Sequence, residues 1–206
     1  MPHNSLTIKY TLDRVAAAVL LVMWTPLLLA LFVAVWIALG PPVLFRQQRL
    51  GFRKRPFELL KFRTMRQASG LADAERLTTF GCVLRRTGLD ELPQLVNILR
   101  GEMSFIGPRP LLVRYGPYFS AEEQQRHLVR PGITGWAQIH GRNQSPWEER
   151  LQRDVWYVRH HSLALDALIL GRTVLLVLGG RGFDPAPAAV RRDFDAERAA
   201  AARGLP

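Results

Sequence analysis

Two adjacent carboxylates, Asp90 and Glu91, are the residues of this sequence best suited to carry out chemistry. A stiff turn carrying an arginine, Gly107-Pro-Arg-Pro110, follows them. Glycosidases use paired carboxylates, but their carboxyl groups lie about 5 Å or more apart on opposite sides of the scissile bond, and adjacent residues suit this arrangement poorly. Phosphoryl transfer fits better, because a carboxylate can act as a nucleophile or hold Mg²⁺ while arginines neutralise the phosphate.

The residues after this carboxylate pair have the spacing of a short helix that ends at Gly101. The apolar residues that we expect to face a core are Leu92, Leu95, Val96 and Leu99. The polar residues that we expect to face away are Gln94, Asn97 and Arg100. Asp90 is predicted to be the N-cap, with Pro93 tolerated in the first turn. For this stretch alone, helix capping without chemistry is the more common role.

A position at the helix start also predicts the charge state of Asp90. The positive end of the helix dipole and nearby cations both favour a carboxylate. We therefore expect Asp90 to be ionised, with a pKa below the reference value of about 3.9. The nearest cations in the sequence are Arg85 and Arg86, at the end of a helix predicted over residues 78–86. Structural ion pairing is the default interpretation for these two arginines.

A basic β-hairpin is predicted upstream, from β-like runs at residues 43–50 and 56–65. Eight lysines and arginines lie between Arg46 and Arg66, directly after an apolar run. For most of them we expect a solvated patch held to acidic lipid headgroups. Lys61 and Arg63 are candidates for more, because they are embedded among apolar residues where an idle charge is costly.

The apolar run extends from Val15 to Gly40 without a charged residue. As one helix it would be about 39 Å long, enough to cross a hydrocarbon core of roughly 30 Å with tilt. Pro26 removes a backbone hydrogen bond near its middle and predicts a break at Thr25-Pro26. Basic residues flank both ends, which suits a hairpin that returns to the side it entered. These residues alone leave the kinked span and the hairpin equally open.

The composition limits the partners and the kind of site. The 206-residue chain carries a formal net charge of +11 and has a pI of about 11.1. An anionic partner is therefore expected, which could be nucleic acid, an acidic membrane surface or a phosphorylated substrate. Cys82 is the only cysteine, which excludes an internal disulfide framework and a zinc site built from several cysteines.

The second half of the chain contains one glycine-rich loop among predicted helices. Residues 130–143 include three glycines, with Trp136, Gln138, Arg142 and Asn143 as polar or stacking groups. A ligand-binding loop and a plain turn are equally open there. Helices are predicted after two capping boxes, at residues 120–123 and 145–148, and over residues 163–178 in a core or at a membrane interface. The tail from about residue 184 is expected to be loose or marginally helical.

Five motifs occur in a fixed order along the chain. They are Lys61-Phe-Arg-Thr-Met65, Leu89-Asp-Glu-Leu-Pro-Gln-Leu95, Gly101-Glu-Met-Ser-Phe-Ile-Gly-Pro-Arg-Pro110, Arg130-Pro-Gly-Ile-Thr-Gly-Trp-Ala-Gln138 and Asp154-Val-Trp-Tyr-Val158. Together they resemble the bacterial sugar transferases, or monotopic phosphoglycosyl transferases. The resemblance covers roughly residues 9–177. We therefore expect an α+β fold with a re-entrant hairpin at residues 1–42, a catalytic domain at 43–180 and a variable tail at 181–206.

The resemblance implies the transfer of a sugar-1-phosphate from a UDP-sugar to a polyprenyl phosphate, with release of UMP. It makes Asp90 the nucleophile and a contact of Mg²⁺, with Glu91 as its catalytic partner. Arg109 would bind phosphate. Its helpers would be Arg85, Lys61 and Arg142. The Ser-Pro pair at which the family's hairpin breaks is Thr25-Pro26 here, which favours the hairpin over the span.

The resemblance also implies a bacterial inner-membrane protein with its catalytic domain and both termini on the cytoplasmic face. We expect membrane lipids and no nucleic acid among its partners, and include a homodimer among the assemblies to be considered. Ile139-His140 departs from the family's usual Val-Asn, and the tail after Gly180 matches no known pattern. One alternative is a non-catalytic, membrane-anchored basic protein, which leaves the pairing of carboxylates with Arg109 unexplained. Another is a phosphoryl or glycosyl transferase acting on a different lipid.

Overall fold

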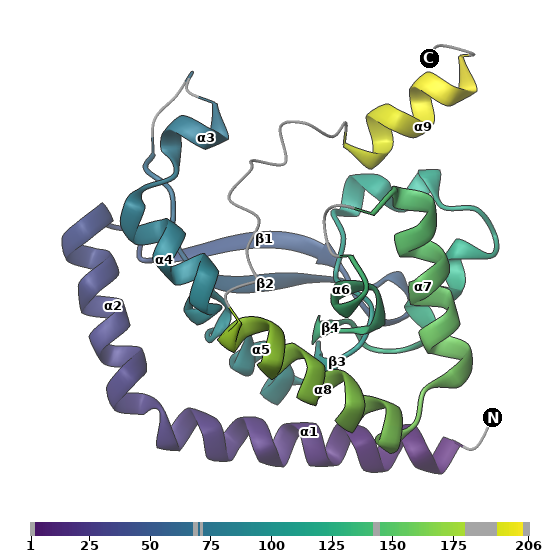
Figure 1. Cartoon of the computed structure of the whole chain (residues 1–206), viewed down its shortest axis with the longest axis horizontal. Coiled ribbons are helices and arrows are strands. Elements are labelled where there is room, and N and C mark those ends of the chain that lie inside the picture. Colours follow the sequence, from purple (N-terminus) through teal and green to yellow (C-terminus); the bar gives the residue numbers. More distant parts are fainter. Residues whose placement is uncertain (1–2, 68–69, 71, 142–144, 180–192, 204–206) are drawn as a thin grey trace.

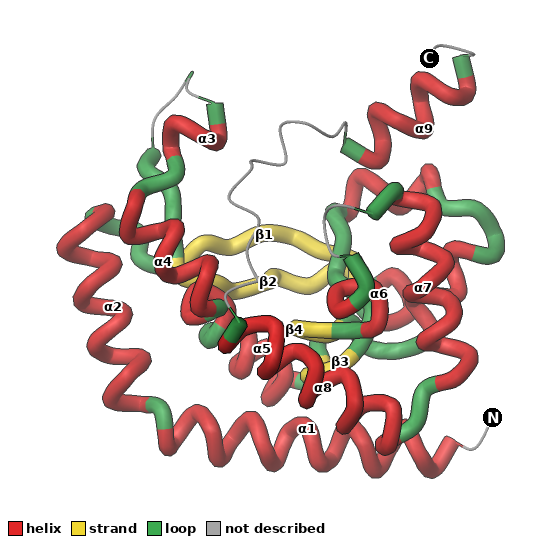
Figure 2. Tube along the Cα trace, in the orientation of Figure 1, coloured by secondary structure: helices red, strands yellow, loops and turns green. Residues whose placement is uncertain are grey.

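The computed structural model describes residues 3–67, 70, 72–141, 145–179 and 193–203. In these residues helices surround two small two-stranded sheets, which confirms the α+β class (Figures 1 and 2). The α-helices are α1 (His3–Met23), α2 (Thr25–Leu39), α3 (Asp73–Arg76), α4 (Thr79–Thr87), α5 (Gln94–Arg100), α6 (Trp136–Ile139), α7 (Trp147–His160), α8 (Leu163–Leu178) and α9 (Phe194–Ala202). The strands are β1 (Leu44–Leu50), β2 (Pro56–Phe62), β3 (Ser104–Ile106) and β4 (Gly132–Thr134). Short 3-10 helices are η1 (Phe52–Lys54), η2 (Leu89–Glu91), η3 (Val113–Tyr118) and η4 (Glu123–Leu128).

The apolar N-terminal run forms two helices, α1 and α2, that meet at a bend of 67° (Figure 1). Trp24 separates them and Pro26 lies in the first turn of α2, so the predicted break is confirmed. The Thr25 hydroxyl donates to the carbonyl of Leu21 at 2.7 Å, which satisfies an acceptor near the break. Among the described residues no single helix is both long and apolar enough to cross a membrane, whereas the bent pair meets that criterion jointly.

Helix α1 starts at His3, well before the apolar run, and its charged residues Lys9 and Asp13 are buried against the rest of the protein. The Lys9 ammonium donates to Asp166 of α8 at 2.6 Å. The Asp13 carboxylate accepts from the Ser104 hydroxyl of β3, also at 2.6 Å. Buried charges that are paired in this way are tolerated inside a protein. The N-terminal helix is therefore fastened to β3 and α8 before it reaches the bend.

Strands β1 and β2 form the predicted hairpin, with Leu44 opposite Phe62 and Leu50 opposite Pro56. Most residues of β2 are buried. Leu59 belongs to a core cluster with α1 and α5, and Phe62 belongs to a second cluster with α2 and α4. Burial on both sides makes β2 a fixed strand, and it carries Lys61.

Helix α5 buries Leu95 and exposes Arg100 as predicted, but the rest of its buried stripe differs from the prediction. Gln94 and Asn97 are only 2% and 0% exposed, whereas Leu99 is 44% exposed. The reason is that the Asn97 amide bonds the backbone of β2. It accepts from the Leu60 N–H at 3.1 Å and donates to the Glu58 carbonyl at 2.7 Å. Apolar spacing does not reveal an asparagine that binds a neighbouring strand, so this part of the prediction was wrong.

Of the two predicted capping boxes, one is confirmed. The Ser120 N–H donates to the Glu123 carboxylate at 2.7 Å, and the Glu123 N–H donates to the Ser120 hydroxyl at 3.2 Å. The second box is wrong, because α7 begins without a side-chain cap and the Ser145 hydroxyl accepts from Arg153 at 2.7 Å instead.

The described part of the tail forms helix α9, on the opposite side of the molecule from α1 (Figure 1). The sequence assigned it no fixed position, because it lacks apolar periodicity. A single aromatic residue, Phe194, anchors it. Phe194 is 0% exposed and packs against Tyr115, Phe119 and Trp147.

Candidate active site

The structure brings five of the predicted site residues together from four parts of the chain. They are Lys61 on β2, Arg85 in the last turn of α4, Asp90 and Glu91 on η2, and Arg109 in the turn after β3. The sixth, Arg142, and its neighbour Asn143 lie outside the described residues. Residues spread over almost fifty positions of the chain thus converge on the two carboxylates.

Asp90 lies on a 3-10 turn and is not the N-cap of α5, so that prediction was wrong. Gly88 ends α4 with a φ of 72°, a left-handed conformation that glycine adopts readily. The chain then continues through η2, and the residue preceding α5 is Pro93, itself in a helical conformation. No extended residue therefore precedes α5 from which a side chain could fold back as a cap.

Glu91 is held by cations from two directions. The Lys61 ammonium donates to the Glu91 carboxylate, and an Arg109 nitrogen lies 3.7 Å from the same oxygen. The Lys61 and Glu91 side chains are 17% and 21% exposed, so solvent screens their contact only partly. These contacts fix Glu91 in place between β2 and the turn that carries Arg109.

Asp90 is more deeply buried than Glu91, at 7% exposed. Burial raises the pKa of the Asp90 carboxyl to about 6, and the like charge of Glu91 acts in the same direction. Lys61, Arg85 and Arg109 oppose the shift. The prediction that cations hold this pKa below its usual value was therefore wrong, because the desolvation of the carboxylate outweighs them. Asp90 becomes a carboxyl group that ionises near neutral pH.

Arg85 is oriented by close packing of α4 on the strand end. Its Nε donates to the hydroxyl of Thr64 at 2.9 Å. Arg63, the other embedded cation of the sequence, binds elsewhere: it donates to the carbonyls of Leu39, Gly40 and Pro41 at the end of α2. Arg63 therefore stabilises a helix terminus and is not part of the carboxylate cluster.

The turn that carries Arg109 rests on the glycine-rich loop. The Gly107 N–H donates to the Thr134 carbonyl at 2.9 Å, and the Gly132 N–H donates to the Pro108 carbonyl at 3.0 Å. A Cβ atom on Gly132 would lie 2.1 Å from the Gly107 nitrogen, so only glycine allows this approach. These glycines therefore allow a close approach between two backbone segments.

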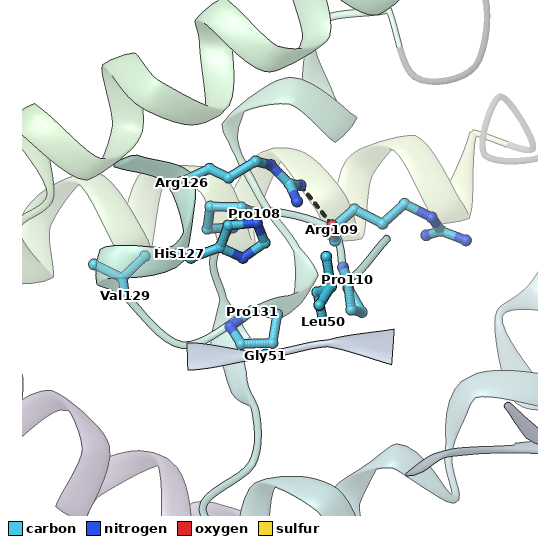
Figure 3. Close-up of a pocket in the computed structure, with 9 residues that line it drawn as sticks. All are labelled: Leu50, Gly51, Pro108, Arg109, Pro110, Arg126, His127, Val129 and Pro131. Carbon is cyan, nitrogen blue, oxygen red and sulfur yellow. Dashed lines mark hydrogen bonds between the residues drawn. The ribbon is translucent and has the colours of Figure 1, made fainter. Parts of the chain in front are cut away.

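A buried ion pair that the sequence did not reveal also holds this turn. Arg126 donates to the Arg109 carbonyl at 2.7 Å and pairs with Asp154 of α7 at 2.8 Å. The Arg126 and Asp154 side chains are 2% and 6% exposed. Figure 3 shows Arg126 reaching the Arg109 backbone while the Arg109 side chain points away from the other labelled residues. The signal in the sequence was Asp154 itself, which lies on the apolar face of α7 between Leu151 and Val155.

A small cleft lies beside Glu91. Its lining residues are Arg49, Leu59, Lys61, Glu91, Gln94, Arg109, Pro110, Gly132 and Ile133. Three of these are cations from β1, β2 and the turn, and one is a carboxylate. Sequence reasoning had assigned Arg49 to the lipid-facing patch and missed its place in this cleft. The arrangement suits a ligand that carries more than one negative charge.

The carboxylate pair is also suited to part of a magnesium site. Mg²⁺ in proteins is usually held by one or two carboxylates, with water and substrate phosphates completing its shell. Asp90 and Glu91 are adjacent and fit such a pair. No cluster of three or more His, Cys, Asp or Glu residues capable of holding a metal occurs in the described part of the chain. Water and substrate oxygens would supply the remaining ligands.

Comparison with known proteins agrees with this picture. The sequence model of the family described as bacterial sugar transferase matches residues 4–180. The sugar transferase EpsL of Bacillus subtilis is 46% identical over 180 residues, which is 85% of this chain and 89% of EpsL. The UDP-glucose:undecaprenyl-phosphate glucose-1-phosphate transferase of Xanthomonas campestris pv. campestris is 40% identical over 81% of this chain and 38% of its own length.

A further relative differs in its sugar. The UDP-N-acetylgalactosamine-undecaprenyl-phosphate N-acetylgalactosaminephosphotransferase of Aeromonas hydrophila is 39% identical over 85% of this chain and 44% of its own length. The chain thus spans less than half the length of the Xanthomonas and Aeromonas relatives. These two relatives are named for different sugars, yet they are about equally identical to this chain. Sequence identity alone therefore does not show which sugar this chain uses.

Proposed function

The chain belongs to the bacterial sugar transferase family, and we therefore propose that it transfers a sugar-1-phosphate from a UDP-sugar to a polyprenyl phosphate such as undecaprenyl phosphate. The observation that carries this proposal is the placement of Asp90. It is a buried carboxyl next in the chain to Glu91, which lines the cleft, and Lys61, Arg85 and Arg109 are close enough to influence its charge. This arrangement matches what attack on a phosphorus atom requires, because the cations offset the charge that develops on the phosphate oxygens.

The proposed reaction has two steps, both at Asp90. In the first, the carboxylate attacks the phosphorus that bears the sugar, a bond from Asp90 oxygen to phosphorus forms, and the bond to the UMP oxygen breaks. In the second, an oxygen of the lipid phosphate attacks the same phosphorus and the Asp90 carboxylate leaves. Retention of the sugar–phosphate bond in both steps yields a sugar linked to the lipid through a diphosphate.

The residues around Asp90 receive separate roles. Arg109, with Arg85 and Lys61, is proposed to bind phosphate oxygens. Glu91 is proposed to hold Lys61 and Arg109 in position through its two ion pairs. Asp90 would also hold Mg²⁺, which supplies charge stabilisation of phosphate oxygens when bound.

The bent pair of α1 and α2 is proposed to lie in the bacterial inner membrane as a re-entrant hairpin, with the catalytic part on the cytoplasmic face. Large apolar side chains of α1 are exposed, among them Val15, Val19 and Val22. Helix α8 exposes Val174, Leu175 and Leu178. Exposed apolar faces of this kind suit lipid. A lipid-linked substrate would then need no transfer out of the bilayer to reach the cleft.

The test of the reaction uses the purified full chain in detergent or nanodiscs. Undecaprenyl phosphate, Mg²⁺ and a panel of UDP-sugars are supplied, and released UMP is measured. We expect UMP from at least one UDP-sugar, and an adduct of the sugar-phosphate mass on Asp90 in intact-protein mass spectrometry. Asp90→Asn should lose both, whereas Glu122→Gln, a change at an exposed surface carboxylate, should keep both. No UMP from any UDP-sugar would favour the non-catalytic basic protein instead.

The topology has its own test. A Cys82→Ser background allows single cysteines to be placed at His3 and Arg203, near the two ends of the described chain. In intact cells both positions should be protected from a membrane-impermeant maleimide, and both should react after lysis. Labelling of only one of them in intact cells would place the ends on opposite sides and restore the spanning helix.

A further inference from the structure

Arg49 is the one cation lining the cleft, among the described residues, to which the proposed reaction assigns no role. It lies near the end of β1, opposite Phe57 of β2, and lines the cleft together with Lys61 and Arg109. Its neighbour Arg46 lies three residues earlier on the strand and therefore on the opposite face. Arg46 pairs with Glu58 at 3.4 Å, and its side chain is 62% exposed. The same strand thus sends one arginine to solvent and one into the cleft.

Arg49 has no carboxylate partner among the residues that the structure describes. Its NH1 donates to the Pro110 carbonyl at 3.4 Å, and its NH2 donates to the Gln47 side chain. Its Nε is buried and bonds nothing in the described chain. By contrast, Lys61 and Arg109 both contact Glu91, and Arg126 is paired with Asp154. A partly buried guanidinium without a counterion is costly, so an arginine kept in this state is unusual.

Arg49 lacks a carboxylate partner among the described residues, and it is also repelled by a neighbouring positive charge. Burial lowers the pKa of Arg49 to about 10, and the positive charge of Arg109 contributes in the same direction. Two guanidinium groups therefore share one side of the cleft. A bound anion would relieve both the desolvation and the repulsion, since guanidinium groups bind phosphate oxygens through several parallel N–H donors.

The fold also fixes Arg49 relative to Arg109. The Leu50 N–H donates to the Leu111 carbonyl at 2.9 Å, and Arg49 itself forms an isolated antiparallel bridge with Leu112. The end of β1 is thus bonded to the chain that leaves the Arg109 turn. A rigid spacing between two cations is the arrangement expected of a preorganised anion site.

We propose that Arg49 is a further phosphate-binding residue, whose guanidinium contacts a substrate phosphate group bound between it and Arg109. This inference rests on the proposed function, which supplies phosphate groups from two sources, the diphosphate of the UDP-sugar and the phosphate of the lipid. In either case Arg49 acts directly on the ligand. It is distinct from Arg126, which supports the turn without reaching the cleft.

The first experiment measures binding of UDP and of uridine to the full chain by isothermal titration calorimetry. Arg49→Gln is compared with Arg46→Gln, which makes the same charge change on the solvent face of the same strand. Loss of a charged hydrogen bond should raise the Kd for UDP roughly tenfold or more in Arg49→Gln. Uridine binding should not change, and Arg46→Gln should match the wild type.

The second experiment identifies which phosphate is bound. If the UDP affinity of Arg49→Gln is unchanged but its KM for undecaprenyl phosphate rises roughly tenfold, the phosphate is that of the lipid. The proposal is overturned if Arg49→Gln matches Arg46→Gln in both measurements, or if it loses UDP and uridine affinity in equal proportion. If the glutamine variant does not fold, Arg49→Lys takes its place, and the proposal is overturned if that variant keeps both the wild-type Kd for UDP and the wild-type KM for undecaprenyl phosphate.

Failure of the proposed function is a separate outcome. A wild-type protein that binds UDP but releases no UMP from any UDP-sugar overturns the transferase activity. The effect of Arg49→Gln on UDP binding would still decide the role of Arg49.

Discussion

Lys61 on β2 forms an ion pair with Glu91 on η2, and this contact joins the buried strand to the carboxylate pair. This ion pair engages the Glu91 carboxylate. Among the described residues, Asp90 has several cations nearby but forms a short contact with none of them. Lys61 is nevertheless the largest of the cationic influences on the charge of Asp90. Lys61 therefore favours ionisation of the proposed nucleophile, against the larger and opposite effect of burial.

The first prediction concerns the pH dependence of the reaction. Since the pKa of Asp90 is raised to about 6, kcat/KM for the UDP-sugar should rise with pH through an acid limb near pH 6. Lys61→Met removes a cation that favours the ionised form, so the limb should move to higher pH. Glu91→Gln removes a like charge and should move it to lower pH.

The control for this prediction is Lys54→Met, which removes a lysine that bonds Gln124. Its acid limb should coincide with that of the wild type, measured at one fixed Mg²⁺ concentration. A limb that stays in place in both Lys61→Met and Glu91→Gln would show that the titrating group is not Asp90.

The second prediction concerns stability at the proposed nucleophile. In the folded protein the pKa of Asp90 lies above its usual value, so the folded state binds a proton more tightly than the unfolded state between about pH 4 and pH 6. Stability contributed by this group is present below pH 4 and is lost as pH rises to about 6. Asp90→Asn stays neutral, so in the absence of Mg²⁺ it should unfold at a higher temperature than the wild type at pH 8.

The size of that gain follows from the shift. Two pKa units correspond to roughly 2–3 kcal/mol in the free energy of unfolding. Differential scanning fluorimetry at pH 8 and at pH 4.5 should therefore show a Tm advantage of Asp90→Asn at pH 8 that shrinks markedly at pH 4.5. An advantage of the same size at both pH values would mean that ionisation is not its cause.

The third prediction concerns the buried ion pair between Arg126 and Asp154. Removing one partner leaves the other charged and buried, so Arg126→Met or Asp154→Leu should each destabilise the protein by about 3–5 kcal/mol. The double variant should cost much less than the sum, because no charge is left unpaired. Urea unfolding of the four proteins gives this double-mutant cycle.

The same variants test support of the Arg109 turn. Arg126 donates to the Arg109 carbonyl, so a folded double variant should still lose turnover, with the fall mainly in kcat. Arg159→Met, which removes an arginine paired with exposed Glu122, is the matched control and should retain both stability and turnover. Additive destabilisation in the cycle would show that the two residues act independently.

The fourth prediction concerns the C-terminal helix α9. Phe194 is fully buried among three aromatic residues, so Phe194→Ala should destabilise the domain by about 3–5 kcal/mol. Phe45→Ala, at a phenylalanine that is 42% exposed, should cost far less. Equal effects of the two substitutions on the midpoint of urea unfolding would mean that α9 is not held on the domain in solution.

Much of the local structure could be predicted because it depends on neighbours in the sequence. The hairpin of β1 and β2, the break at Thr25-Pro26 and the Ser120–Glu123 capping box all follow from turn residues, proline geometry and short-range hydrogen bonds. Helix α5 was located correctly, but its buried face was predicted only in part. Its burial depends on Asn97 bonding a strand that lies almost forty residues earlier in the chain.

The amino-acid sequence specifies the chemistry available at this site: a carboxylate pair, the cations Lys61, Arg85 and Arg109, and the residue order that marks the family. Those are properties of residue type and order, which folding does not change. The tertiary structure alone decided the charge state of Asp90 and the position of Arg49. Both depend on how much water remains around a group and which charges from distant segments surround it, and these are set only when β1, β2, η2 and the Arg109 turn pack together.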